Sequence, residues 1–301
     1  MPSFRAAPVR VRVPATSANL GPAFDSAGLA LALYDDVIVR IADSGLSVDV
    51  AGEGAEDLPR DKRHLVVKSL RAAFTALGGQ PRGLEVVCAN RIPQARGLGS
   101  SSGAIVAAVL AARALVLGGE ELLDDDAALA LATELEGHPD NVAACLRGGL
   151  TFAWTGPTGV RVHRVEVHPD VRPVAFVPST KASTKKVRGL LPETVPHADA
   201  AANAGRTALL SLAMTSAPSL LLDATQDYLH QSYRASAMPR SAALVAGLRA
   251  EGIPAVVSGA GPTVLALASA ATVEAVAARH PRGWEVSALA VEPHGATVLP
   301  L

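Results

Sequence analysis

The stretch "QARGLGSSSGAIVAAV", residues 94–109, decides how the rest of the sequence is interpreted. Gly97, Gly99 and Gly103 surround three consecutive serines, and a run rich in Ala and Val follows at once. This run predicts a helix over residues 100–117 that ends at the glycine pair 118–119. The first N–H groups of a helix lack partners, and glycines let an anion approach them without meeting a Cβ atom. Because serine hydroxyls donate to phosphate oxygens or join the shell of a magnesium ion, the loop predicts a polyphosphate site.

Other interpretations of this loop stay open at this point. Ser100 could serve only as a helix cap. The pattern G-x-S-x-G is also present, which would make Ser101 the nucleophile of a hydrolase and require a late histidine, His280 or His294. No strand leads directly into the turn, as that motif needs. The dinucleotide fingerprint fails at Ser102, and the Walker pattern fails because no Lys-Ser/Thr follows the last glycine.

Composition and charge exclude several classes of protein. The chain has 301 residues, enough for one large or two medium domains, and 49% of them are apolar. Its 27 basic and 28 acidic residues give a net charge of −1, which provides no general attraction for nucleic acid or for an anionic membrane. Cys88 and Cys145 are the only cysteines, so no disulfide framework is expected. No signal peptide or membrane span is recognisable, and we expect a soluble cytoplasmic protein.

Short apolar runs alternate with Ala-rich segments along the chain, which favours the α+β class over one continuous parallel sheet. Strands are expected at residues 9–13, 37–41, 46–50, 84–88, 160–167, 173–177, 255–257 and 264–268, and further helices at 127–136, 206–217, 241–251 and 272–280. The segment "AWTGPTGV", residues 153–160, is the best boundary candidate because two glycines and a proline lie between strands.

Two further segments carry polar residues at element ends. In "ELEGHPDNVAACLRGGL", residues 134–150, Glu136 lies in the last turn of a predicted helix, and Asp140 and Asn141 follow Pro139. Carboxylates that face a phosphate loop would suit a bridging magnesium ion, although the segment by itself favours a solvated helix end, and Asp140 and Asn141 could also form an Asx-turn. In "VVSGAGPTVLAL", residues 256–267, Gly259 and Gly261 predict a tight turn between strands.

Taken in order, "GLGSSSGA", "EGHPDNVA" and "SGAGPT" resemble the motifs of the GHMP small-molecule kinases. The run "VRVPATSANLGPAFDSAGLAL", residues 11–31, is similar to the branch of that family that phosphorylates L-homoserine. The resemblance spans nearly the whole chain. It implies an N-terminal α/β phosphate-loop domain over residues 1–155, a C-terminal ferredoxin-like domain over residues 156–301, and an active site between them.

The resemblance also implies the roles of individual residues. ATP phosphates would be wrapped by the glycine loop, with the turn near 259–261 alongside: Pro93, Arg96, Gly97, Leu98, Gly99, Ser100, Ser101, Ser102, Gly103, Gly259 and Gly261. A loop serine (Ser101, otherwise Ser100) and Glu136 would share Mg²⁺, with Glu134 as the fallback.

Homoserine is a zwitterion that carries a hydroxyl group, so its pocket needs both charges. Asp25 and Asp140 would meet the ammonium, Arg188 and Arg234 the carboxylate, and Asn19 would also reach the substrate. Asn141 would orient the attacking hydroxyl without acting as a base, because an amide cannot take a proton at neutral pH.

Some features depart from the family or leave its assignment open. Ser102 replaces a common alanine, His64 stands where relatives often have asparagine near the adenine pocket, and His138 is interpreted as structural. A different hydroxylated acceptor, such as mevalonate or a sugar, is the alternative within the family, and a non-catalytic nucleotide-binding protein is a further one. The family's tendency to dimerise leaves a homodimer open.

Overall fold

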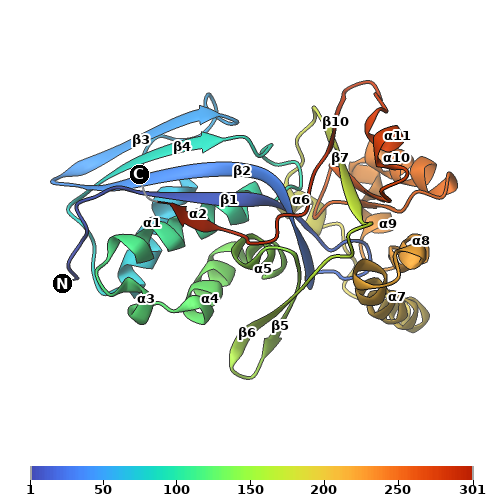
Figure 1. Cartoon of the computed structure of the whole chain (residues 1–301), viewed down its shortest axis with the longest axis horizontal. Coiled ribbons are helices and arrows are strands. Elements are labelled where there is room, and N and C mark those ends of the chain that lie inside the picture. Colours follow the sequence, from blue (N-terminus) through green and yellow to red (C-terminus); the bar gives the residue numbers. More distant parts are fainter. Residues whose placement is uncertain (1, 300–301) are drawn as a thin grey trace.

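The computed structural model describes residues 2–299, with the side chains of residues 184 and 185 outside that description. It contains two sheets, each covered by helices, and this confirms the α+β class (Figure 1). We call the seven-stranded sheet with its helices the N-terminal unit, and the four-stranded sheet with its helices the C-terminal unit. Within residues 2–299, no helix combines the length and the apolar composition that crossing a bilayer requires.

The N-terminal sheet has the strand order β11-β1-β2-β4-β3, and β5 pairs with β2 and β6. Its strands are β1 (Val9–Ala18), β2 (Ala27–Ala42), β3 (Gly45–Gly52), β4 (Gly83–Asn90), β5 (Leu150–Gly156), β6 (Gly159–Val165) and β11 (Thr297–Leu299). Among the strands of residues 2–299, only β3 and β4 pair in parallel, and α1 (Leu65–Ala76) provides the crossover between them.

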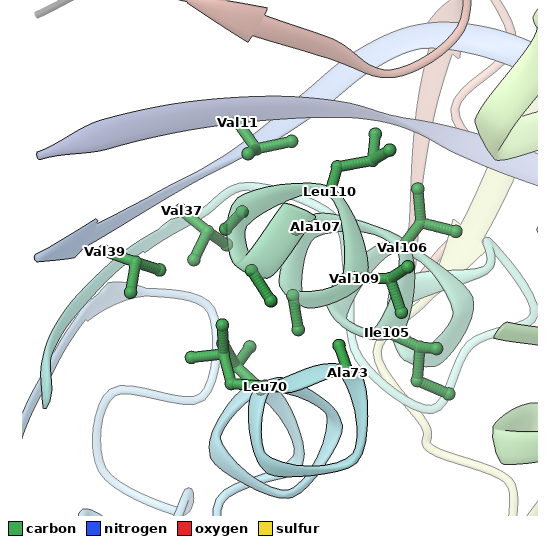
Figure 2. Close-up of a cluster of buried hydrophobic side chains, with 14 of the residues drawn as sticks. Val11, Val37, Val39, Leu70, Ala73, Ile105, Val106, Ala107, Val109 and Leu110 are labelled. Carbon is green, nitrogen blue, oxygen red and sulfur yellow. The ribbon is translucent and has the colours of Figure 1, made fainter. Parts of the chain in front are cut away.

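Helix α2 (Ser100–Leu115) forms the centre of the N-terminal core. Every residue from Ile105 to Ala112 is buried, as expected for a helix that is apolar on all sides. In Figure 2, Val11 and Val37 of the sheet and Leu70 of α1 lie around this helix. Alanine at many positions lets α1 and the sheet approach its backbone closely, so the start of α2 is held on a rigid support.

Helix α2 was predicted over residues 100–117, and in the structure it ends two residues earlier, at Leu115. Gly118 does adopt the left-handed conformation, with a φ of 72°, but it precedes the short helix α3 (Gly119–Leu122) and is not the C-cap of α2. Two further helices of this unit are α4 (Asp125–Glu136) and α5 (Asp140–Arg147). Helix α4 ends at Gly137, whose φ is 94°, as the sequence predicted.

The C-terminal sheet is antiparallel, with the order β10-β7-β9-β8. It consists of β7 (Arg172–Pro178), β8 (Ala255–Val257), β9 (Val264–Ala268) and β10 (Trp284–Ala288). The helices of this part of the chain are α6 (Thr184–Arg188), α7 (His197–Thr215), α8 (Leu221–Ala224), α9 (Gln231–Arg234), α10 (Pro239–Ala250) and α11 (Val273–Ala277), with 3₁₀ turns at Pro218–Leu220 and Ala235–Ala237.

Two features join the units. Residues 28–31 of β2 pair with Ala15–Ala18 of β1 beyond a bulge at Pro14, so both strands continue into the junction with the C-terminal unit. After β10 the chain crosses back, and β11 pairs with the outer edge of β1 (Figure 1). The division at residue 155 stays a prediction; that position lies in β5, whose hairpin partner β6 belongs to the same sheet.

Candidate active site

One cavity lies where the glycine loop, the β1–β2 loop and the C-terminal unit meet. It receives side chains from both units. In Figure 1, β1 ends and β2 begins on one side of this place, and α6 and α9 approach from the C-terminal unit. We call it the acceptor cavity. Its lining includes most of the residues that the sequence assigned to a site: Asn19, Asp25, Pro93, Arg96, Gly97, Leu98, Gly99, Ser100, Ser101, Glu136, Asp140, Asn141, Arg188, Arg234 and Gly259.

The glycine loop is shaped by close packing. Gly97 and Gly99 have φ values of 81° and 71°, a region that favours glycine. A Cβ atom at Gly97 would collide with the Ser258 carbonyl, and one at Gly99 would collide with the Thr16 hydroxyl. These glycines therefore press the loop against both neighbours, which is a different reason from the anion approach that the sequence suggested.

Helix α2 begins beside the cavity without a side-chain cap. Its N-cap residue is Gly99, so the interpretation of Ser100 as a mere capping residue is wrong. The first-turn N–H groups of this 16-residue helix are thus left for water or for a ligand. Helix dipoles add partial positive charge at this end.

Glu136 faces the start of α2. Its Oε2 accepts a hydrogen bond of 2.8 Å from Ser101, and its Oε1 accepts one of 2.8 Å from Ser102. Ser102 is fully buried, so its hydroxyl holds the carboxylate instead of lining the cavity. Glu134 is exposed and does not line the cavity, which leaves Glu136 as the acid that α4 presents.

The turn after α4 positions Asp140. Its Oδ1 accepts from the His138 ring nitrogen Nδ1 at 2.6 Å and from the Asn141 backbone N–H at 2.7 Å. Burial lowers the pKa of His138, but the hydrogen bond and the charge of Asp140 outweigh it and raise that pKa above the usual value. His138 also lines the cavity, a position that its interpretation as a structural residue missed.

Asn141 is held from behind by Thr16. The Thr16 hydroxyl donates to Asn141 Oδ1 at 2.7 Å, and Thr16 is fully buried. This contact fixes the orientation of the amide, and Nδ2 is the donor that Asn141 can offer to the cavity. No role was predicted for Thr16, although it lies within the run "VRVPATSANLGPAFDSAGLAL", residues 11–31.

Asp25 and Arg188 form a bidentate ion pair inside the cavity. Arg188 Nη1 and Nη2 donate to Asp25 Oδ2 and Oδ1, both at 2.7 Å. The hydrogen bond to Asp25 raises the pKa of Arg188. Phe24 lies between two guanidinium groups, 5.3 Å from that of Arg188 and 5.2 Å from that of Arg234.

Arg234 is 2% exposed, and its Nε has no hydrogen-bond partner in the part of the chain that the structure describes. Burial, followed by the nearby charge of Arg188, lowers its pKa. A buried guanidinium with an unused donor is costly unless a ligand completes its hydrogen bonds. It therefore marks the part of the cavity where an anion fits best.

Asn19 is a left-handed residue with a φ of 71° that ties the two units together. Its Nδ2 donates to the Gly259 carbonyl at 3.0 Å, and its Oδ1 accepts from the Asp25 backbone N–H at 3.0 Å. Asn19 thus lines the cavity but also fixes the loop that carries Asp25.

Three residues of the predicted set lie away from the cavity lining. Ser102 is turned toward Glu136. Gly103 packs against Val13, and a Cβ atom added at Gly103 would lie 3.4 Å from a Val13 methyl group. Gly261 faces Met238, whose sulfur would lie 2.6 Å from an added Cβ. Arg96 does line the cavity, but its Nε donates to the Pro178 carbonyl at 2.9 Å and so anchors the loop to β7.

A second cavity, of about 210 Å³, adjoins the first at Ser100 and Ser101. We call it the apolar cavity because side chains such as Val13, Val37 and Leu65 line it. Asp35 and His64 are its titratable groups other than Cys88.

Both of these groups are held by backbone N–H groups. His64 Nδ1 accepts from the Val66 N–H at 3.2 Å, which leaves Nε2 as the protonated and unpartnered nitrogen. Burial raises the pKa of Asp35 to about 6, although its Oδ1 accepts from the N–H groups of Arg91 and Ile92.

Comparisons with known proteins agree with this geometry. The GHMP kinases N terminal domain matches residues 64–149, and the GHMP kinases C terminal domain matches residues 200–286. A homoserine kinase of Streptomyces coelicolor is 64% identical over 300 residues, covering 100% of this chain and 97% of the relative. One of Clavibacter michiganensis is 51% identical over 296 residues, covering 96% and 93%.

The crystal structure of homoserine kinase from Cytophaga hutchinsonii superposes with a TM-score of 0.84 and 25% identity, covering 99% of each chain. Family domains, curated relatives and fold thus agree over the whole length, and they confirm the family and the fold that the motifs predicted. The chain belongs to the homoserine kinases of the GHMP kinase family.

Proposed function

We propose that this protein transfers the γ-phosphoryl group of ATP to the side-chain hydroxyl of L-homoserine. The observation that carries the proposal is the acceptor cavity, in which three carboxylates and three guanidinium groups lie beside the unsatisfied start of α2. Such a cavity offers both charges that an amino acid zwitterion needs next to a place for phosphates.

The phosphates would lie against the glycine loop, from Gly97 to Ser101. Close packing of that loop against Thr16 and Ser258 keeps its backbone amides in place, so little reorganisation is needed when phosphate binds. The adjoining apolar cavity would take the nucleotide base, with the His64 Nε2–H and the Asp35 carboxyl group as its polar contacts.

The residues around Glu136 fit a magnesium ion. Glu136 and Ser101 present hard oxygen atoms to the cavity side of the loop, and magnesium prefers a few protein oxygens together with water and phosphate oxygens. Bound there, Mg²⁺ would neutralise charge on the transferring phosphate. Ser102 keeps the Glu136 carboxylate in position from the buried side.

The homoserine carboxylate would pair with Arg234, whose Nε is unused, and with Arg188. The ammonium would meet Asp25 and Asp140. In the absence of substrate, Asp25 and Arg188 satisfy each other, so substrate binding exchanges one internal ion pair for two external ones. A neutral sugar would leave the buried Arg234 guanidinium without an anion, which favours an acceptor that carries a carboxylate.

Asn141 would hold the acceptor hydroxyl by donating from Nδ2, since the contact of its Oδ1 with Thr16 fixes the orientation of the amide. An amide takes no proton at neutral pH, so Asn141 would orient the hydroxyl and not act as its base. The hydroxyl oxygen would bond to the γ-phosphorus as the bond to ADP breaks, and its proton would pass to a phosphate oxygen. Positioning and charge neutralisation are the main contributions of a protein to phosphoryl transfer.

A coupled ADP-release assay with Mg²⁺ and a panel of acceptors tests the proposal. We expect turnover with L-homoserine and a product with the mass of O-phosphohomoserine, and none with mevalonate, shikimate or galactose. Turnover confined to an acceptor that is not an amino acid would overturn the substrate assignment. Fluorophosphonate labelling at Ser101 would instead support the hydrolase alternative, which the contact of Ser101 with Glu136 disfavours.

A further inference from the structure

His230 is a fully buried histidine whose ring contacts both the β1–β2 loop and Arg234, and these two parts of the chain line the acceptor cavity from opposite units. Its Nε2 is 2.7 Å from the Gly21 carbonyl oxygen. A carbonyl oxygen only accepts hydrogen bonds, so Nε2 carries the proton. Nδ1 is then an acceptor, and Arg234 Nη1 lies 3.2 Å from it as the donor.

These two partners, Gly21 and Arg234, belong to two different parts of the cavity wall. Gly21 lies in the β1–β2 loop that carries Asn19 and Asp25, the part that would bind the ammonium. That loop has little room to shift, because Gly21 has a φ of 90° and an added Cβ would lie 2.6 Å from the Thr225 carbonyl oxygen. Arg234 belongs to the C-terminal unit and to the part that would bind the carboxylate.

Few other contacts fix the Arg234 guanidinium. Besides His230, Nη1 reaches the Gly259 carbonyl at 3.5 Å, which is a long hydrogen bond, and Nε has no partner. The Phe24 ring lies 5.2 Å from the guanidinium and also 5.2 Å from the imidazole ring. The direction of Arg234 therefore depends on the imidazole.

The surroundings of His230 keep its ring neutral and in place. Asp227 accepts the N–H groups of Leu229, His230 and Gln231, and its carboxylate lies 3.6 Å from His230 Nε2. Burial lowers the pKa of His230, against the opposing charge of Asp227, and so preserves the unprotonated Nδ1 that Arg234 needs.

We propose that His230 is a positioning residue that sets the spacing between Arg234 and the Asp25 loop, and that this spacing selects an α-amino acid over the same acid without its amine. The inference rests on the proposed function. It adds a residue that contacts neither the phosphates nor the reacting hydroxyl. Loss of His230 should therefore weaken acceptor binding and acceptor selectivity while the chemical step remains intact.

Three variants separate the two hydrogen bonds. His230→Asn keeps an oxygen near the Nδ1 position for Arg234 but cannot reach Gly21, whereas His230→Gln reaches Gly21 but loses the acceptor for Arg234. His230→Phe loses both and keeps a ring against Phe24. His168→Gln, in the same unit and outside the acceptor cavity, is the matched control.

The readout is the ratio of kcat/KM for L-homoserine to that for 4-hydroxybutyrate. We expect KM for homoserine to rise about tenfold or more in His230→Phe and His230→Gln and less in His230→Asn. We also expect kcat to stay within about threefold and the selectivity ratio to fall in all three variants. A ratio equal to that of the wild type, or equal losses for both substrates, would show that His230 has only a structural role.

A second measurement uses the wild-type protein, so it does not depend on the variants folding. In a ¹⁵N-histidine-labelled sample, His230 should show a protonated Nε2 and a bare Nδ1, and L-homoserine should shift the Nδ1 resonance. A protonated Nδ1, or an Nδ1 chemical shift that does not change when homoserine is added, would overturn the inference. If the wild type fails to phosphorylate homoserine at all, the proposed function fails first, and that result is separate from an unchanged selectivity ratio.

Discussion

The acceptor cavity and the apolar cavity share the start of α2 but are built in opposite ways. The acceptor cavity draws charged groups from both units, and its contacts join residues as far apart as Asp25 and Arg188. The apolar cavity lies within the N-terminal unit, with mostly aliphatic lining and a few polar groups fixed by backbone N–H groups. Charged side chains brought together from distant parts of the sequence can discriminate among acceptor substrates, whereas an aliphatic cavity accommodates a flat apolar group.

This contrast implies that substitutions should separate cleanly into those that affect the shared phosphate loop, those that affect the acceptor and those that affect only the apolar side. The largest effect is expected at Glu136, which accepts a hydrogen bond from Ser101 at the junction of the two cavities.

Glu136→Ala should lower kcat by about 100- to 1,000-fold, because it removes the carboxylate that faces the phosphate loop and leaves Ser101 and Ser102 without their acceptor. Steady-state assays with saturating ATP and homoserine measure this loss. Glu134→Ala, on the exposed side of the same helix, should keep wild-type kcat. Similar losses in both variants would argue that α4 as a whole, and not the Glu136 carboxylate, is needed.

Arg234→Lys should raise KM for homoserine by about 30-fold and leave KM for ATP unchanged, because an ammonium cannot reproduce the bidentate grip of a buried guanidinium. Arg240→Lys, at an exposed position of the same unit, provides the control. A parallel rise in the KM values of both substrates would remove the distinction between the two cavities.

Asp35→Asn tests the apolar side through stability. Burial raises the pKa of Asp35 to about 6 in the folded protein, above its value in the unfolded chain, so the protonated carboxyl favours folding. This contribution is present at acid pH and is lost as the pH rises through about 6, which amounts to about 1 kcal/mol between pH 5 and 7.5.

The asparagine variant should lack that pH-dependent decrease in the free energy of unfolding, measured by urea denaturation at both pH values. Asp49→Asn, at an exposed position on β3, should behave like the wild type. If Asp35→Asn follows the same pH dependence as the wild type, the carboxyl is not desolvated as the structure indicates.

Local patterns predicted the elements that carry their own signal. Strict alternation marked the start of β1, and the short strands β8 and β9 were predicted with their observed bounds. The first part of β2, from Ala27, was missed because it is buried on both faces and shows no alternation. Helix α7 begins at His197, nine residues before the predicted start, since its Ala-rich first turns have no clear apolar face.

For the site, the motifs predicted which residues gather but not how they bond to one another. Asp25, Arg188 and Arg234 do meet, yet nothing local indicates that Asp25 pairs with Arg188 or that Thr16 holds Asn141. These contacts bridge 163 and 125 positions of the sequence, and only the folded chain decides them. Gly261 shows the converse: it belongs to a motif but packs against Met238. The homodimer stays a prediction.

The pairing of β11 with β1 also bears on how the protein is made. Residues 297–299 pair with positions 10–12 and so close the outer edge of the first sheet with a segment that is synthesised long after β1. Until then, a nascent chain carries β1 as an open edge that can pair with a neighbouring polypeptide. While the second half of the chain is being translated, the outer edge of β1 is therefore exposed. A fragment that stops at residue 155 would keep this edge unpaired.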